Sequence, residues 1–295
     1  MKKVLMILAA ICMTMAANAK ILRVSNVSGS SAPYATFDAA QEAAAEGDTI
    51  MFDASPNSYG NFEVIKRLVL IGPGYWLSTN GIVEVGEETA ELGDVIVKVE
   101  NCVFKGLTLD LTIRANKTVV NRCYLRGLAL RNASNSIIHQ NFIRSNVEGY
   151  GSSYEESYIQ LTNNIIKGRI SDLTNSYIAY NTLTSFFSCD NCTIEYNIGP
   201  RNDTFPTNNG NNSTNNLVSD AYNSFFNAIG TFTDQQFYNI YLEESLKNTY
   251  GVFAGTSPYV ISGVPSGPII TDLEMPTTVE VGSTPTVTIK VSISK

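Results

Sequence analysis

The chain has 295 residues, enough for one large domain or two modest ones. Only 16% of its residues are charged and the formal net charge is −7, which argues against a basic nucleic-acid-binding protein. Asn, Ser and Thr are common and Trp occurs once, a composition typical of a secreted protein that is rich in strands and turns.

Residues 1–19 have the three parts of a secretory signal peptide. Lys2 and Lys3 form a basic start, an apolar run follows, and Ala17-Asn18-Ala19 has the small residues of a cleavage site. The apolar run is too short to span a bilayer, and no later segment is long and apolar enough. We therefore expect export across the inner membrane, to the periplasm or to the cell surface and beyond, without a membrane span.

A short helix is predicted from Phe37 to Glu46. Thr36 is a suitable N-cap, and Gly47 is a suitable residue to follow the last turn. The segment Gly47-Asp48-Thr49-Ile50 then leads into a strand.

A repeat begins with NCVFKGL at 101–107 and NRCYLRGL at 121–128. Its members are 16 to 23 residues apart and form one column: Cys102, Cys123, Asn141, Asn164, Asn181 and Asn197. An aliphatic residue precedes every member by three positions. A period this short, with β-branched runs broken by Asn, Gly and Ser, predicts a solenoid of strands and tight turns. Each unit would bury its apolar side chains against the next unit.

The Asn column predicts a stack of inward side chains that bond to the backbone and to one another. Cys102 and Cys123 would then lie on adjacent rungs, where parallel Cβ directions favour stacked thiols over a disulfide. Cys189 and Cys192 are interpreted as a small disulfide or as two buried thiols. A redox or metal site is not expected there, since the chain has one histidine and no second ligand pair.

These features resemble the right-handed parallel β-helix proteins of the pectin-lyase-like superfamily. The segment from Tyr34 to Gly74, with its helix, its Tyr-Gly pair at 59–60 and its Ile-Gly-Pro-Gly ending, resembles the family's entry module. The C-terminal part from Tyr250 resembles the closing segment of secreted β-helix proteins of Bacteroidetes. The resemblance implies an all-β, single-stranded, right-handed parallel β-helix, covered at its N-terminal end by the helix and closed by C-terminal strands.

The predicted organisation is a signal peptide at 1–19, a β-helix domain at 20–267, and capping strands or a tail at 268–295. Thr286 to Ser294 alternates polar and apolar residues, as a half-buried strand does. The Asn-rich residues 201–216 are interpreted as a mobile surface turn.

Catalytic residues are not assigned. The resemblance implies hydrolases with paired Asp residues and Gly-His-Gly, and lyases with a basic residue and a cation site, but this chain lacks those motifs. Asp110 and Asp172 are candidate carboxylates because they lie near strand ends, and His139 is interpreted as a half-exposed turn residue. No metal or cofactor is expected. If the protein is an enzyme, the resemblance favours a polysaccharide lyase over a hydrolase.

A basic column is the clearest candidate site. It contains Lys105, Arg126, Arg144 and Lys167, each one position after an inward aliphatic residue and so expected to point outward. Arg114 and Arg131 form a shorter second column. Tyr150 and Tyr154 lie in a nearby insertion and could stack on sugars or simply pack against the solenoid. The basic column itself could bind a linear polyanion, or it could be a solvated strand end.

The leading hypothesis is a secreted, monomeric β-helix that contacts an acidic polysaccharide through these residues. The alternatives are a lyase or hydrolase acting on uronic-acid glycans, and a structural or adhesive surface scaffold.

Overall fold

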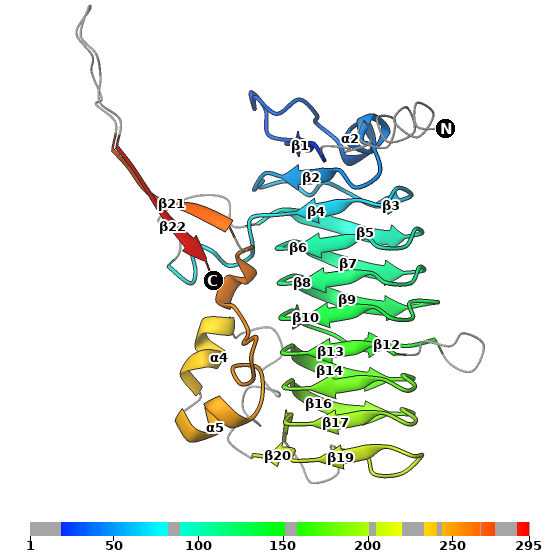
Figure 1. Ribbon diagram of the computed structural model, residues 1–295. Helices are drawn as coiled ribbons and strands as arrows, with labels where there is room; N and C mark the ends of the chain where they lie inside the picture. The colour runs from blue at the N-terminus through cyan, green and yellow to red at the C-terminus, as the bar shows by residue number, and fades with distance from the viewer. Residues whose placement is uncertain are drawn as a thin grey trace, which may run out of the picture.

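The computed structural model describes residues 19–81, 89–150, 158–200, 205–219, 233–240, 244–265, 267–274 and 288–294. Its body is a parallel β-helix, in which the chain winds through rungs that stack along one axis (Figure 1). The predicted solenoid fold is therefore confirmed. Residues 1–18 of the predicted signal peptide, and Tyr154, lie outside the described residues.

The first sheet forms one wall of the solenoid and contains ten parallel strands. They are β1 (Ile21–Val24), β2 (Thr49–Phe52), β4 (Val69–Ile71), β6 (Val103–Lys105), β8 (Val119–Asn121), β10 (Ile137–His139), β13 (Gln160–Thr162), β15 (Tyr177–Ala179), β17 (Thr193–Glu195) and β19 (Asn212–Thr214). Phe104 pairs with Val120, which pairs with Ile138, and all three side chains are fully buried. The central residue of each short strand thus points inward, as the period of two requires.

The second sheet forms the opposite walls. Its strands are β3 (Phe62–Val64), β5 (Glu91–Val97), β7 (Thr108–Ile113), β9 (Tyr124–Leu130), β11 (Phe142–Ile143), β12 (Val147–Glu148), β14 (Ile165–Ser171), β16 (Thr182–Phe187), β18 (Ile198–Gly199) and β20 (Leu217–Val218). The longer strands contain a corner where the register shifts, as between Leu109 and Asp110 in the β7–β9 pair. Extra residues at this corner point out of the ladder.

An asparagine ladder runs inside the solenoid through Asn141, Asn164, Asn181, Asn197 and Asn216. The Asn164 Nδ2 donates to Oδ1 of Asn181 at 3.0 Å, and the backbone N–H of Asn141 donates to Oδ1 of Asn164 at 2.9 Å. The first four residues are fully buried. The predicted stack of inward Asn side chains is confirmed, and it satisfies polar groups at a turn that water does not reach.

The predicted alignment of Cys102 with this column is wrong. The residue that precedes Cys123 in the column is Leu107. The Tyr124 N–H donates to the Leu107 carbonyl at 2.9 Å, and on the next rung the Phe142 N–H donates to the Cys123 carbonyl at the same distance. Cys102 lies at the start of a first-sheet strand, directly before β6, whereas Cys123 lies after the end of β8. The two thiols therefore do not stack, although Cys102, Cys123, Cys189 and Cys192 are all free and buried.

The Asn-rich segment 201–216 also differs from its prediction. Residues 201–204 lie outside the described part, but β19 and β20 form a further rung of the solenoid. Asn211 accepts from the Cys192 N–H at 2.9 Å and donates to the Cys189 carbonyl at 2.7 Å. Amide side chains thus replace the apolar pattern that marks the earlier rungs.

The N-terminal end of the solenoid is covered by α2 (Phe37–Ala43). Thr36 caps it as predicted, with its hydroxyl accepting from the Ala39 N–H at 3.4 Å. Phe37 stacks on Phe62 of β3 with ring centroids 3.8 Å apart. The helix is three residues shorter than predicted, because Ala44 is already extended, with ψ at 145°.

The chain leaves the solenoid after β20 and returns along its side (Figure 1). It forms α4 (Asp234–Ile240), α5 (Glu244–Thr249), a segment of turns and irregular chain at 250–265 that contains the 3₁₀ turn η4 (Ile261–Gly263), and an antiparallel hairpin of β21 (Gly267–Glu274) and β22 (Thr288–Ser294). We call residues 250–265 the C-terminal arm. The strand predicted near the C-terminus is present as β22.

The C-terminal arm docks on a column of tight turns that follows the first sheet. The turn residues have positive φ and include Gly106, Arg122, Gln140, Asn163, Tyr180 and Tyr196. Asn163 donates to the carbonyls of Val252 and Ala254, and Arg122 donates to that of Val264 at 2.9 Å. Polar side chains on several rungs thus hold the backbone of the arm.

A buried polar cluster joins the arm to the body around Asp234, the first residue of α4. Its carboxylate accepts from the Ser262 N–H at 2.5 Å, from Asn80 Nδ2 at 2.6 Å and from the Tyr259 hydroxyl at 3.1 Å. The Tyr259 hydroxyl also bonds to that of Tyr75. Burial raises the pKa of Asp234, and the hydrogen bonds it accepts only partly oppose that rise.

We expect the stability of the wild-type protein, relative to an Asp234→Asn variant, to fall as pH rises through the raised pKa of Asp234. The folded state holds this proton more tightly than the unfolded state does. The contribution is therefore complete below the unfolded pKa and is lost as pH rises through the folded pKa. Urea unfolding of both proteins between about pH 4 and 7 measures the difference. A difference that is constant over this range would contradict the raised pKa.

Candidate functional site

Two adjoining hollows lie on the outward face of the second sheet, where its strands continue past the corner. The first has a volume of about 180 Å³ and is lined by Asp110, Leu111, Thr112, Gly127, Leu128, Ala129, Ser145, Asn146 and Glu148. The second is lined by Glu148, Gly149, Tyr150, Arg169, Ser171 and Asp172. They share Glu148, so we treat them as one feature, the outer groove.

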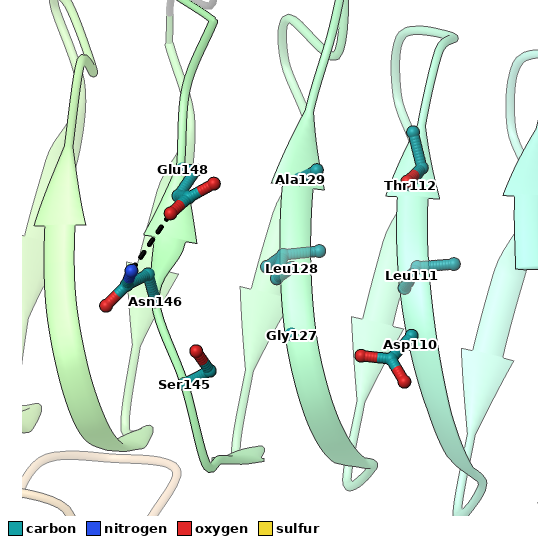
Figure 2. Close-up of a pocket in the computed structure, with 9 residues that line it drawn as sticks. All are labelled: Asp110, Leu111, Thr112, Gly127, Leu128, Ala129, Ser145, Asn146 and Glu148. Atoms are coloured by element: carbon teal, nitrogen blue, oxygen red, sulfur yellow. Dashed lines mark hydrogen bonds between the residues drawn. The ribbon is translucent and has the colours of Figure 1, made fainter. Parts of the chain in front are cut away.

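The floor of the outer groove is open because the central rung carries small residues. Gly127 and Ala129 lie on β9, between the rung of Asp110 and the rung of Glu148 (Figure 2). A Cβ atom at Gly127 would stand 3.3 Å from Oδ1 of Asp110, so a larger side chain would fill the hollow. Asn146 Nδ2 donates to Oε1 of Glu148 at 2.9 Å and orients that carboxylate (Figure 2).

Two half-exposed aromatic rings border the second hollow of the outer groove: Tyr150 lines it, and Phe187 pairs with Ser171, which also lines it. Tyr150 is 50% exposed and Phe187 is 58% exposed. The guanidinium carbon of Arg131 lies 4.2 Å from the Tyr150 ring centroid, and that of Arg169 lies 5.4 Å from the Phe187 centroid. Each arginine therefore covers one face of its ring. Arg169 is exposed, whereas Arg131 is half-buried and its Nε is buried.

The corner beside the outer groove carries most of the predicted basic column. Arg126, Arg144 and Lys167 follow Leu125, Ile143 and Ile166, which pair with one another across β9, β11 and β14. Lys105 does not belong to this column. It lies in β6 of the first sheet, where it pairs with Asn121. The prediction placed it in the column because it aligned Cys102 with Cys123. The column thus has three cations on successive rungs.

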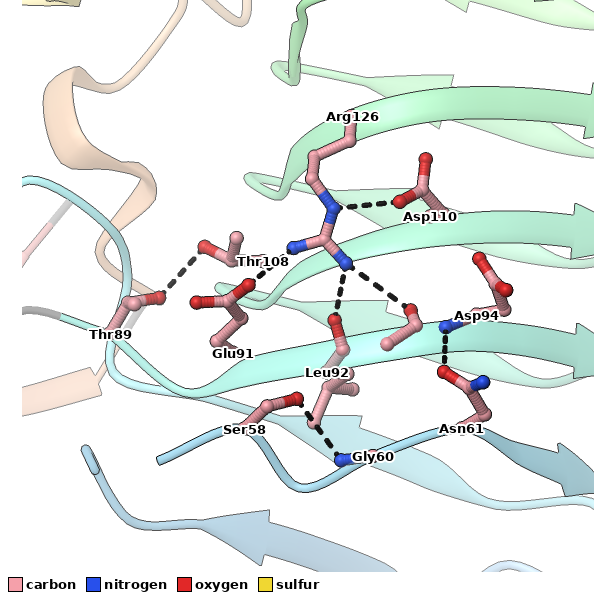
Figure 3. A network of polar contacts seen from close by, with 11 residues as sticks. Ser58, Gly60, Asn61, Thr89, Glu91, Leu92, Asp94, Thr108, Asp110 and Arg126 are labelled. Carbon is pink, nitrogen blue, oxygen red and sulfur yellow. Dashed lines mark hydrogen bonds and ion pairs between the residues drawn. The ribbon is translucent and has the colours of Figure 1, made fainter. Parts of the chain in front are cut away.

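Arg126 is fully engaged in the fold. Its Nε lies 2.7 Å from Asp110 Oδ2 and its NH1 lies 2.9 Å from Glu91 Oε1, while NH2 donates to the Leu92 carbonyl at 2.6 Å (Figure 3). The β7 strand has no residue opposite Arg126, and the guanidinium fills this gap in the corner. Two carboxylates neutralise it, so Arg126 contributes little to the attraction of an anion.

The neighbouring cations have a different environment. Arg144 is exposed and lies near Tyr124. Burial lowers the pKa of Lys167, and the charge of Arg144 lowers it further. Because Ile143 pairs with Ile166, Arg144 and Lys167 lie on neighbouring rungs, at the edge of the groove that Ser145 lines.

The shorter basic column is present in register. Ile113 pairs with Leu130, and Arg114 and Arg131 directly follow these residues. Lys98 precedes them in the same column, where it forms an ion pair with Glu63 at 2.6 Å. Among the residues that the structure describes, Arg114 and Arg131 form no ion pair.

The candidate carboxylates Asp110 and Asp172 are not brought together. Asp110 is on β7 and Asp172 directly follows β14, with β9 and β12 between them. Three strand spacings separate their backbones by about 14 Å along the solenoid axis, and an offset along the strands adds to this distance. An inverting glycosidase holds its carboxyl groups only about 6.5 to 9.5 Å apart, so this pair does not fit that chemistry. In the described part of the chain, no three His, Cys, Asp or Glu residues gather as a metal site would require.

Phe187 and Arg169 were missed in the sequence. Both lie outside the columns that the repeat defines, because the corner inserts different numbers of residues on each rung. The available signal was the pattern Arg169-Ile170-Ser171, in which an aliphatic residue stands between two polar residues. Such a pattern predicts that Ile170 points inward and Arg169 outward.

The fold and the outer groove define a parallel β-helix with an aromatic-edged, charged surface site, an architecture compatible with carbohydrate-associated proteins. Comparisons with protein-family models, with curated proteins and with solved structures found no match for this chain. Membership of the pectin-lyase-like superfamily therefore stays a prediction. No helix within the described ranges is long and apolar enough to cross a membrane.

Proposed function

We propose that this protein is an exported, carbohydrate-binding β-helix that holds an acidic polysaccharide along the outer groove. The observation that carries the proposal is the combination of half-exposed rings with charged side chains around an open floor. A sugar ring has apolar C–H faces that pack on aromatic rings, while its hydroxyl groups bond to carboxylates and guanidinium groups.

The spacing of the solenoid supports a linear ligand. Neighbouring rungs are about 4.8 Å apart, which is close to the advance of an extended glycan per sugar. Glu148, Ser171 and Phe187 occupy successive rungs of one column, in which Glu148 and Phe187 are exposed and Ser171 between them is buried. A chain that lies parallel to the axis meets each rung in turn.

Asp110, Glu148 and Asp172 line the groove itself, so the proposal of an acidic glycan depends on the cations at its rim, a set that differs from the sequence-based one. Arg131 and Arg169 border the groove and form no ion pair with the described residues, whereas Arg126 is neutralised. Arg144 and Lys167 add positive charge at the corner. Carboxylate groups on the glycan would be drawn to these cations, and salt would screen that attraction.

We expect the mature protein to be retarded in native gels that contain polygalacturonate, and moderate salt to reduce the retardation. The double variant Arg131→Gln/Arg169→Gln should bind at least about tenfold more weakly, because charge-assisted contacts supply orientation and attraction. Arg67→Gln is the control, since it removes one exposed charge far from the groove. Equal retardation of wild type and double variant, or none across a panel of acidic glycans, would overturn the proposal and favour a scaffold role.

A further inference from the structure

The one histidine of the chain forms a second constellation, away from the outer groove. His139 ends β10 on the first sheet, and its Nε2 lies 3.0 Å from the Ser257 hydroxyl in the C-terminal arm. Its Nδ1 lies 2.8 Å from the Thr162 hydroxyl. A hydroxyl, an imidazole and a second hydroxyl are thus connected in series.

The surrounding structure fixes all three groups. Thr162 pairs with His139 across β10 and β13, so its hydroxyl is held on the next rung. Gln140 donates its side-chain amide to the carbonyls of Ser257 and Pro258 and fastens the arm beside the ring. Ser257 and Pro258 are exposed, so a molecule in solution can reach the Ser257 hydroxyl.

This series has the parts of a nucleophilic serine. With the ring proton on Nδ1 and donated to Thr162, Nε2 accepts the Ser257 proton, which is the arrangement of nucleophile, base and orienting group. The backbone N–H groups of Thr256 and Ser257 form no hydrogen bond with the described residues. An N–H of the nucleophile itself is a usual donor to the oxyanion of an acyl-transfer reaction.

The protonation state of the ring suits a base. Burial lowers the pKa of His139 from its ordinary value, a hydrogen bond with the Thr162 backbone opposes that shift, and the charge of Arg122 lowers the pKa further. At neutral pH the imidazole is therefore uncharged and can accept a proton.

We propose that Ser257 and His139 form an esterolytic site that cleaves small exposed esters, such as O-acetyl groups, with Thr162 as a positioning residue. The Ser257 oxygen attacks the ester carbonyl while Nε2 takes the hydroxyl proton. The C–O bond then breaks, and the departing alcohol receives that proton. Water attacks the acyl-serine and gives a proton to Nε2, which returns it to Ser257 as the carboxylic acid leaves.

The test uses the mature protein, 4-nitrophenyl acetate as the ester, and a fluorophosphonate probe followed by peptide mass spectrometry. We expect the probe on Ser257 and nitrophenol release above the buffer rate at neutral pH. Ser257→Ala should remove both signals, and His139→Gln should lower the rate by about 100-fold, the usual contribution of a general base. Ser28→Ala, at an exposed serine far from the site, should change neither.

Thr162 is tested by a conservative pair. Thr162→Val should lower the rate and alter the pH profile, while Thr162→Ser, which keeps the hydroxyl, should restore both. In the wild type, the rate should rise through an apparent pKa below 6.5 and then level off. Circular dichroism and thermal unfolding confirm that each variant is folded. Ester cleavage that persists in folded Ser257→Ala, or a probe that leaves Ser257 unlabelled, would show that the hydroxyl only fastens the arm.

Discussion

Replacing Asn164 by alanine is expected to lower the free energy of unfolding by about 3 to 5 kcal/mol, because several buried polar groups lose their partners together. The Asn164 Nδ2 donates to the carbonyls of Ile138 and Thr162 and to Asn181 Oδ1. Its Oδ1 accepts from the backbone N–H and the side-chain amide of Asn141. Alanine removes all five bonds from a fully buried site.

Urea unfolding followed by circular dichroism measures this loss. Asn57→Ala is the matched control, since Asn57 is exposed, and it should change stability by less than about 0.5 kcal/mol. A loss below about 1 kcal/mol for Asn164→Ala would mean that water or relaxed neighbours replace the ladder bonds. It would also weaken the view that the ladder holds the rungs together.

The period of the repeat was enough to predict the β-helix and its inward asparagines. A residue that packs one rung above its counterpart must meet the same requirement for size and polarity, so Asn141, Asn164, Asn181 and Asn197 recur in the sequence. Asn216 was missed because Ser213, three residues before it, occupies the position that the aliphatic Ile194 fills in the previous rung.

The first repeat was misaligned for a local reason. Phe104-Lys105-Gly106-Leu107 and Leu125-Arg126-Gly127-Leu128 have similar residues but lie on different sheets. In the structure Gly106 is a tight-turn residue equivalent to Arg122, and both have positive φ. Similarity over a few residues cannot separate two strands of one rung, because both alternate inward and outward residues.

The candidate sites depend on contacts that no local pattern contains. Arg126 has the outward position that the sequence indicates, yet Glu91 and Asp110 on two preceding rungs neutralise it. His139 meets Ser257 only because the C-terminal arm returns along the solenoid over 118 residues of sequence separation. Periodicity thus identifies which residues face outward, and the returning arm and the neighbouring rungs decide what they can do.

Substituting Gly263 by alanine should detach the C-terminal arm and lower the free energy of unfolding by about 2 to 5 kcal/mol, from left-handed strain and steric overlap. Gly263 has a φ of +56°. A Cβ atom there would overlap the Arg122 carbonyl oxygen and the Tyr75 ring. The Tyr75 hydroxyl bonds to that of Tyr259 in the buried polar cluster around Asp234, and the Arg122 side chain donates to the Val264 carbonyl. Neither neighbour can therefore move aside without breaking a hydrogen bond that holds the arm.

Gly255→Ala separates the two causes, because Gly255 lies in the same arm with a φ of +78° but has room for a Cβ at 3.4 Å from the Tyr180 ring. This control should therefore lose only the strain of about 1 to 2 kcal/mol. Limited proteolysis should cut within residues 250–265 of Gly263→Ala and leave the control resistant. Equal losses in both variants would mean that backbone strain alone sets the cost and that the junction around Tyr75 yields to the added methyl group.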